Sequence, residues 1–119
     1  MTTTISRHYV VVEGRLVHYR RAGQGPLLLL LHQSPQSSLD FADLMLRWGE
    51  RFTMIAPDRP GCGQSDPLPD PAPDFDRYGD AVAAFLDVLG IARVPVYGFH
   101  TGAREALSLA ARHPQRVLA

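Results

Sequence analysis

Lysine and asparagine are absent from this 119-residue chain, cysteine occurs once, and there is no long hydrophobic run. All 12 basic residues are arginine, and 12 acidic residues balance them to a formal net charge of zero. A neutral chain exerts no long-range attraction on nucleic acid or on an anionic membrane, so we expect neither as a partner. The absence of lysine and asparagine, with frequent Ala, Pro and Gly, indicates a high-GC bacterial genome.

The scarcity of cysteine and of apolar runs also limits the cellular setting. The lone Cys62 cannot form an internal disulfide, which fits a reducing cytoplasm. The longest apolar run, 27–31, is far too short to span a bilayer. Residues 1–8 contain no apolar segment of the kind that marks a secretory signal. We therefore expect a cytoplasmic protein of ordinary globular composition.

Hydrophobic patterning predicts alternating strands and helices. Strands are expected at 9–12, 15–20, 27–31, 52–56 and 94–97, and helices at 39–48, 76–89 and 103–112. The first two strands read as a hairpin joined at Glu13-Gly14. The later alternation predicts an α/β fold with parallel strands and right-handed crossovers. Residues 116–119 read as the start of a sixth strand.

The helix expected at 39–48 is amphipathic, and Ser37 or Ser38 can cap it. Its apolar face, at spacings of i, i+3, i+4 and i+7, is Phe41, Leu44, Met45 and Trp48. Trp48, like Tyr97 in the last strand, is expected in the core or in a pocket wall.

A five-residue motif joins the last strand to the last helix. Residues 98–102 read Gly98-Phe99-His100-Thr101-Gly102. This is the spacing of the G-x-S-x-G nucleophile elbow, with histidine where the nucleophile is expected. In an elbow the central side chain stands at the top of the sheet. Small residues two positions to either side let the strand and the helix approach closely.

Two further loops accompany this motif in a meaningful order. His32-Gln33-Ser34-Pro35 follows the third expected strand, and the segment 57–66, PDRPGCGQSD, follows the fourth. With these motifs the chain resembles the α/β-hydrolase superfamily, in the branch that holds epoxide hydrolases, haloalkane dehalogenases and C–C bond hydrolases. In that branch the third strand ends in an H-G-x-P oxyanion loop and the fourth in a P-D-x-x-G-x-G-x-S loop. The resemblance covers nearly the whole chain.

The resemblance implies a partial α/β-hydrolase sheet of strand order 1-2-4-3-5, with a stub of strand six and three helices. It implies that residues 1–119 are the N-terminal part of a single domain, without the lid and the C-terminal strands, because the family's acid and histidine follow the elbow. It further implies a small-molecule substrate, namely an ester, amide, epoxide or similar electrophile, and a reaction without cofactor or metal. The fifth strand would then be an exposed edge, so we expect self-association through it.

By the same resemblance, two backbone N–H groups stabilise the oxyanion of acyl transfer, one from Thr101 and one from Ser34. Some family members also use the side chain at the second position, where Ser34 offers a hydroxyl. Gln33 stands where the family usually has glycine. It either strains the loop, if a positive φ is needed there, or places its amide in a differently shaped pocket. We expect Gln33 and Phe99 to contact substrate.

His100 is the larger departure, and two interpretations stay open. The positive end of the following helix disfavours a charged imidazolium, so a neutral His100 could act as a general base or as an unusual nucleophile. Alternatively the nucleophile has been lost, and the domain is a degraded relative that only binds a small molecule.

Other polar residues at the strand ends have simpler interpretations. His32 resembles a structural histidine that braces the oxyanion loop, and Asp58 is expected to bond nearby backbone; a catalytic role is the alternative for each. His32, Asp58 and His100 could also converge on a metal ion. Cys62 is expected to be a small residue tolerated between glycines. The four-proline segment 66–74 is expected to form an ordered loop over the site.

Overall fold

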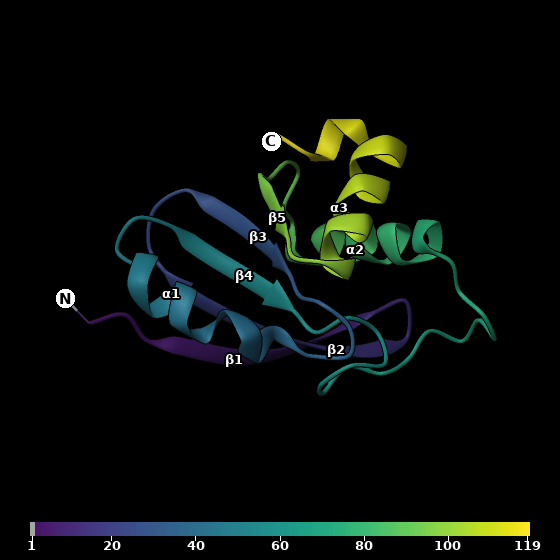
Figure 1. Ribbon diagram of the computed structural model, residues 1–119, viewed down its shortest axis with the longest axis horizontal. Helices are drawn as coiled ribbons and strands as arrows, with labels where there is room; N and C mark the ends of the chain where they lie inside the picture. The colour runs from purple at the N-terminus through teal and green to yellow at the C-terminus, as the bar shows by residue number, and fades with distance from the viewer. Residues whose placement is uncertain (1) are drawn as a thin grey trace.

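A mixed β-sheet organises the chain in the computed structural model, which describes residues 2–119 (Figure 1). Its strands are β1 (Ile5–Val12), β2 (Arg15–Gly23), β3 (Leu27–Leu31), β4 (Thr53–Pro57) and β5 (Val96–Gly98). They lie in the order β1-β2-β4-β3-β5, so the predicted strand order is confirmed. β1, β2 and β4 pair antiparallel, whereas β3 is parallel to both β4 and β5.

Three α-helices pack on this sheet, as predicted. They are α1 (Ala42–Trp48), α2 (Phe75–Leu89) and α3 (Thr101–Arg112), with short 3-10 turns at Ser38–Phe41 and Pro114–Arg116. Ser37 caps the first turn by accepting a hydrogen bond from the Leu39 N–H at 3.2 Å. Asp74 caps α2 through the Arg77 N–H, and Gly90 ends it in the left-handed conformation.

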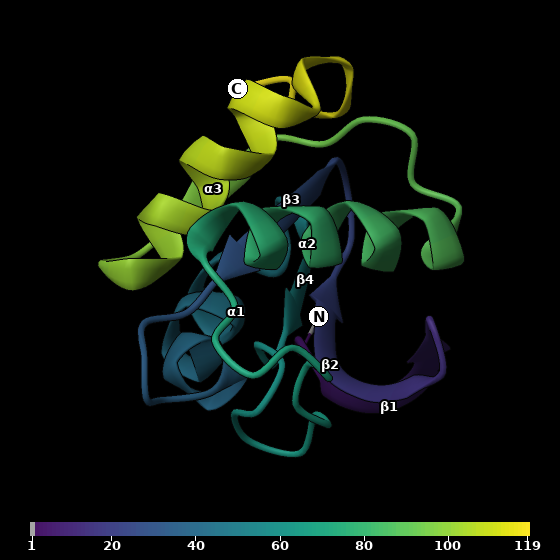
Figure 2. The same cartoon turned by 90° about the vertical axis from the view of Figure 1, so that its right-hand side faces the viewer.

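The alternation of side chains along β3 builds two cores, one on each face of the sheet. Leu29 and Leu31 join the core beneath α2 and α3, while Leu30 joins the core beneath α1. Figures 1 and 2 accordingly show α1 on one side of the sheet and α2 with α3 on the other. This is why the run 27–31 is apolar without interruption.

Two expectations about Trp48 and the last strand need correction. Trp48 is 42% exposed at the end of α1 and belongs to neither core. Of the predicted apolar face, only Phe41 and Met45 are buried. The strand expected at 94–97 is shorter and shifted, since Pro95 has no N–H to donate to a ladder.

The C-terminal residues lie along the outer side of β5, where the sixth strand was expected. Val94 and Val117 form a parallel bridge. The Val94 N–H donates to Arg116 O at 2.9 Å, and the Val96 N–H donates to Ala119 O at 2.9 Å. The edge of β5 is therefore partly covered within the chain. Among the described residues, no helix has the length and apolar character needed to cross a membrane.

Candidate active site

The elbow lies on the sharp turn between β5 and α3. His100 immediately precedes α3 with φ 58° and ψ −115°. Glu13, in the β1–β2 turn, is the one other non-glycine residue between 2 and 119 with a positive φ. A side-chain-bearing residue pays about 1–3 kcal/mol for such a conformation, which persists only where surrounding packing imposes it. The His100 side chain is exposed.

The flanking glycines allow the close approach that the elbow requires. A Cβ on Gly98 would overlap the carbonyl group of Gly102. A Cβ on Gly102 would overlap the carbonyl oxygen of Leu31, at the end of β3. Both overlaps involve backbone, which cannot move aside as a flexible side chain could. The predicted need for small residues at these two positions is therefore met by contacts in the structure.

Ser34 and Thr101, the two expected oxyanion donors, lie side by side, but the Ser34 N–H is already engaged. It donates a hydrogen bond to Thr101 Oγ1 at 2.6 Å. The Thr101 N–H, at the start of α3, contacts no acceptor among the described residues. The backbone donor expected from Ser34 is thus turned toward a side chain of the elbow, and the donor expected from Thr101 is open.

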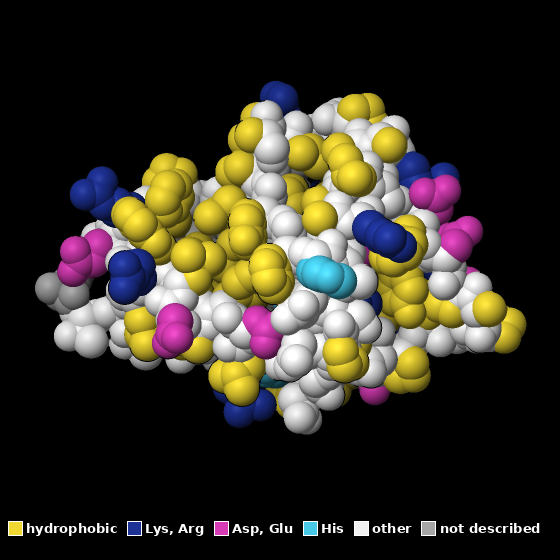
Figure 3. Space-filling model, viewed as in Figure 1, with side chains coloured by type: hydrophobic (Ala, Val, Ile, Leu, Met, Phe, Trp, Pro, Cys, Tyr) yellow, Lys and Arg dark blue, Asp and Glu magenta, His cyan; other side chains and the backbone are white. Residues whose placement is uncertain are grey.

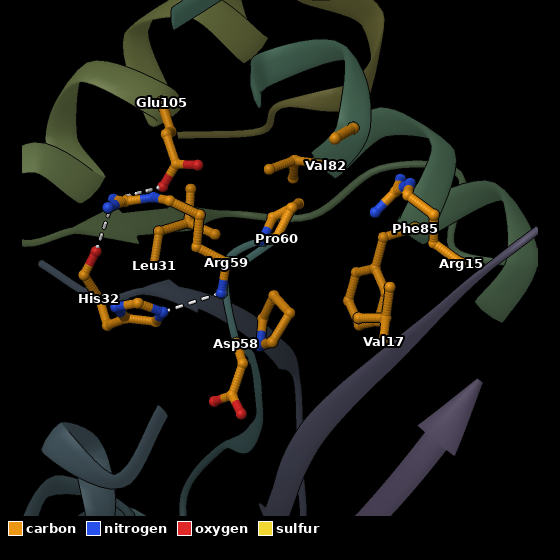
Figure 4. Close-up of a pocket in the computed structure, with 12 residues that line it drawn as sticks. Arg15, Val17, Leu31, His32, Asp58, Arg59, Pro60, Val82, Phe85 and Glu105 are labelled. Atoms are coloured by element: carbon orange, nitrogen blue, oxygen red, sulfur yellow. Dashed lines mark hydrogen bonds and ion pairs between the residues drawn. The ribbon is translucent and has the colours of Figure 1, made fainter. Parts of the chain in front are cut away.

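A buried ion pair beneath the elbow was missed by sequence reasoning. Arg59 Nη2 donates to Glu105 Oε1 at 2.8 Å, to His32 O at 3.0 Å and to Thr101 Oγ1 at 3.3 Å. Arg59 is 8% exposed and Glu105 is 2% exposed. Figure 4 shows the Arg59 guanidinium bridging the oxyanion loop and α3. The sequence feature that could have indicated this pair is Glu105, a charged residue on the inner face of α3, one turn after Thr101.

This arrangement limits the directions in which the hydroxyl hydrogen of Thr101 can point. A threonine hydroxyl has two acceptor lone pairs and one hydrogen to donate. The Ser34 N–H donates to one lone pair at 2.6 Å, and Arg59 Nη2 approaches at 3.3 Å as a weaker donor, since its two hydrogens also serve Glu105 Oε1 and His32 O. The hydroxyl hydrogen is then free to point away from the Ser34 N–H, and Thr101 is one of the residues that line a cleft. The elbow can therefore offer two donors to a ligand, the Thr101 N–H and its O–H.

His32 is placed as a structural residue. Its Nε2 accepts a hydrogen bond from the Arg59 N–H at 2.8 Å, so its Nδ1 carries the proton and donates to Gln33 O at 2.7 Å. The side chain is 1% exposed, and burial lowers the pKa of His32. With both ring nitrogens bonded to backbone, the imidazole braces the oxyanion loop and has no free atom for chemistry.

Asp58 likewise bonds its surroundings. Its carboxylate accepts hydrogen bonds from the Ser38 N–H at 2.8 Å and from the Gln64 N–H at 2.9 Å. Its Oδ2 also lies 2.8 Å from Nδ1 of His18, a fully buried residue of β2 that sequence reasoning missed. Burial alone would raise the pKa of Asp58, but the hydrogen bonds from Gln64, Ser38 and His18 outweigh it and lower the pKa.

A cleft of about 510 Å³ opens beside the Ser34–Thr101 contact. Its far wall comes from the proline-rich segment, through Pro67, Leu68 and Pro73, so this loop does border the site as expected. Cys62 lies in the wall with partial exposure, and burial raises the pKa of its thiol. The cleft thus joins the oxyanion loop, the start of α3 and the loop before α2.

The two expected substrate contacts line a different hollow. Gln33 and Phe99 border a groove of about 360 Å³ on the α1 side, together with Tyr97. Tyr97 is therefore a groove wall and is 46% exposed. Gln33 is not among the residues with positive φ, so the strained-loop interpretation is wrong. The structure does not bring Gln33 and Phe99 into the cleft that holds Ser34 and Thr101.

The convergence of His32, Asp58 and His100 on a metal ion is also not found. Within residues 2–119 no three His, Cys, Asp or Glu side chains group as potential metal ligands.

Comparison with known proteins places these motifs in one family. The sequence profile described as "alpha/beta hydrolase fold" matches residues 26–119. The chain is 35% identical over 105 residues to 2-(acetamidomethylene)succinate hydrolase from Mesorhizobium japonicum, covering 87% of this chain and 37% of that protein. It is 36% identical over 112 residues to the soluble epoxide hydrolase of Corynebacterium sp., covering 92% of this chain and 38% of that protein.

A solved structure of another protein has the same fold over this part of its chain. The haloalkane dehalogenase DbeA from Bradyrhizobium elkani superposes with a TM-score of 0.86 at 37% identity, covering 96% of this chain and 40% of that chain. The chain therefore spans well under half the length of the relatives that it matches.

Proposed function

Because this chain belongs to the α/β-hydrolase fold family, we propose that it forms the N-terminal part of a hydrolase domain whose elbow acts on a small ester, amide, epoxide or similar electrophile. Proteins similar to it include hydrolases of an epoxide and of an acetamidomethylene diacid, and a haloalkane dehalogenase. Each of these relatives is named for a reaction on a small molecule. The proposed reaction needs no cofactor, and its proposed setting is the cytoplasm.

The observation that carries this proposal is the backbone of His100. A positive φ on a residue with a Cβ is retained here at the one position where the family presents its reacting side chain. The two close glycine contacts hold the same turn in place. Backbone strain of this kind is concentrated at active sites and ligand-binding turns. The imidazole of His100 can take a proton from water or attack an electrophile itself.

The proposed stabilisation of negative charge uses Thr101 twice. Its N–H lies at the positive end of α3, and in this proposal its O–H, whose oxygen accepts from the Ser34 N–H, donates into the cleft. Two donors on one residue could serve an oxyanion in place of the Ser34 N–H. The Arg59 guanidinium, 3.3 Å from the same oxygen, makes that hydroxyl a better donor.

One observation favours a second candidate, a non-catalytic member that binds a small molecule. The Ser34 N–H, which the family resemblance assigns to the oxyanion, is satisfied by Thr101. A binding protein has no need of that donor. Such a protein would bind its ligand in the 510 Å³ cleft, and its binding would not require the imidazole of His100.

The deciding experiment compares His100→Ala and His100→Ser in the whole protein that carries this elbow. Hydrolysis of a short p-nitrophenyl ester, a terminal epoxide and a bromoalkane is measured for each. The hydrolase proposal expects one of these activities to fall by at least about 10² in both variants, the usual contribution of an acid–base group. His8→Gln, a change in the distant β1–β2 hairpin, is the matched control and is expected to keep full activity. Native activity that survives His100→Ala would exclude the imidazole from the reaction, whereas a natural protein that turns over none of the three substrates would favour the binding role.

A further inference from the structure

Arg15, the first residue of β2, is a buried arginine with little compensation for its charge. It is 7% exposed, and its Nε and Nη1 contact no acceptor among the described residues. Its Nη2 lies 3.7 Å from Oε1 of Glu13, whose side chain is 57% exposed. An ion pair that is long and open to water on one side compensates a buried guanidinium poorly.

The Arg15 side chain lines a small, partly open cavity. The cavity has a volume of about 20 Å³, enough for a single particle the size of a water molecule. Its walls near Arg15 are apolar and include Val17, Val82 and Phe85. Figure 4 shows the Arg15 guanidinium reaching over Phe85 toward Val82. The cavity thus combines apolar walls with a cationic group at one end.

The other charged residues around the cavity do not neutralise Arg15. Arg59 lies at the opposite end, and its charge is matched by Glu105 at 2.8 Å. The Asp58 carboxylate points away from the cavity and is held by Ser38, Gln64 and His18. The unpartnered buried side-chain polar atoms of this region, Nε and Nη1 of Arg15 and Nε of Arg59, are all donors.

We propose that this cavity is a binding site for one monatomic anion, chloride under ordinary conditions, held by the Arg15 guanidinium. The unpartnered buried side-chain atoms at this cavity are donors, so they call for an acceptor, and a water molecule would satisfy them without neutralising the charge. A halide only accepts hydrogen bonds and also neutralises the charge. Phosphate and carboxylates are too large for this volume. The site uses none of His100, Ser34 and Thr101, so it does not rest on the proposed reaction.

The first test measures thermal unfolding of the full chain at constant ionic strength, with sodium chloride replacing sodium gluconate. A site that binds chloride only in the folded state gives a saturable rise in Tm with chloride. Arg15→Met keeps the length of the side chain and removes the donors, so the rise is expected to disappear. Arg93→Met, at an exposed arginine, is the matched control and is expected to retain it.

The second test does not depend on any variant folding. Crystals of the unaltered chain are grown or soaked in sodium bromide, and anomalous scattering locates the bromide. The proposal expects a peak in the cavity within hydrogen-bond distance of the Arg15 guanidinium. A cavity without such a peak, including one that holds only water, overturns the proposal, and so does a rise in Tm that Arg15→Met leaves unchanged.

Discussion

The backbone N–H of Ser34 donates to Oγ1 of Thr101 at 2.6 Å, which ties the oxyanion loop directly to the first residue of the elbow helix. The contact joins residues 67 positions apart in the chain. It also changes the set of available donors, because a backbone group expected to face substrate is turned to a side chain. The loop and the elbow are therefore held in register by the residue that also presents the open N–H.

Thr101→Val should separate the fold of the elbow from its chemistry. Valine keeps the shape of threonine but removes the hydroxyl, and with it the acceptor for Ser34 and the donor to the cleft. In the whole protein we expect kcat to fall by about 10²–10³, as for loss of one oxyanion donor, with a smaller change in KM. Thr101→Ser restores the hydroxyl and should stay within about tenfold of the natural rate. Full activity in the valine variant would exclude a role for this hydroxyl.

Glu105→Ala should strongly destabilise the chain. It leaves the guanidinium of Arg59 buried without its carboxylate partner. Removal of one partner from a buried ion pair typically costs about 3–5 kcal/mol. The double variant Arg59→Met/Glu105→Leu removes both charges and should lose less. The free energy of unfolding from urea titration measures each. For comparison, Asp87→Asn breaks an ion pair with Arg116 in which the Asp87 side chain is 66% exposed. This change should lower the free energy of unfolding by less than about 1 kcal/mol.

Asp80 should make stability depend on pH in the acid range. Hydrogen bonds from Arg112 above all, and from His113, lower the pKa of Asp80 from 3.8 to about 2. A lowered carboxyl pKa contributes stability that is fully present above the unfolded value. The contribution is lost as pH falls from about 4 to about 2. Because the Asp80 side chain is 34% exposed, we discount the contribution to about 1 kcal/mol.

The measurement for Asp80 is urea unfolding of Asp80→Asn at several pH values. The variant should be less stable than the natural chain at pH 7 and equal to it once the pH is below about 2. Asp43→Asn, at an exposed position of α1, is the control and should show little difference at any pH. A difference that stays constant across this pH range would contradict the assignment.

Residues 1–119 by themselves should associate. β5 is the last strand of the sheet, and the residues that cover part of its edge form a bridge instead of a strand. Tyr97 and Phe99 are each 46% exposed, and Leu118 is 56% exposed. Figure 3 shows hydrophobic side chains gathered in a band over this face. We expect dimers or larger species by light scattering at tens of micromolar, as for an open strand edge. A monodisperse, cooperatively melting monomer would show that the C-terminal segment closes the edge.

Most of the fold could be predicted from local patterns in the sequence. The run 27–31 is apolar because both faces of β3 are covered. A buried strand of this kind can be predicted from its own five residues. The elbow could be recognised in the sequence because its two glycines and its central residue lie within five consecutive positions. Trp48 was misplaced for a complementary reason. Helical periodicity reports which residues share a side, but it does not tell how far the partner surface extends along the helix.

The sequence alone therefore determined the strand order, through a family resemblance, and the position and spacing of the elbow, because these depend on neighbours along the chain. Only the tertiary structure decided which polar groups meet. The Arg59–Glu105 pair, the His18–Asp58 pair and the Ser34–Thr101 bond join residues 46, 40 and 67 positions apart. No local periodicity encodes such pairings. A hydrogen bond needs its two atoms within a few tenths of an ångström of the right separation, and that precision comes from the packing of the sheet against its helices.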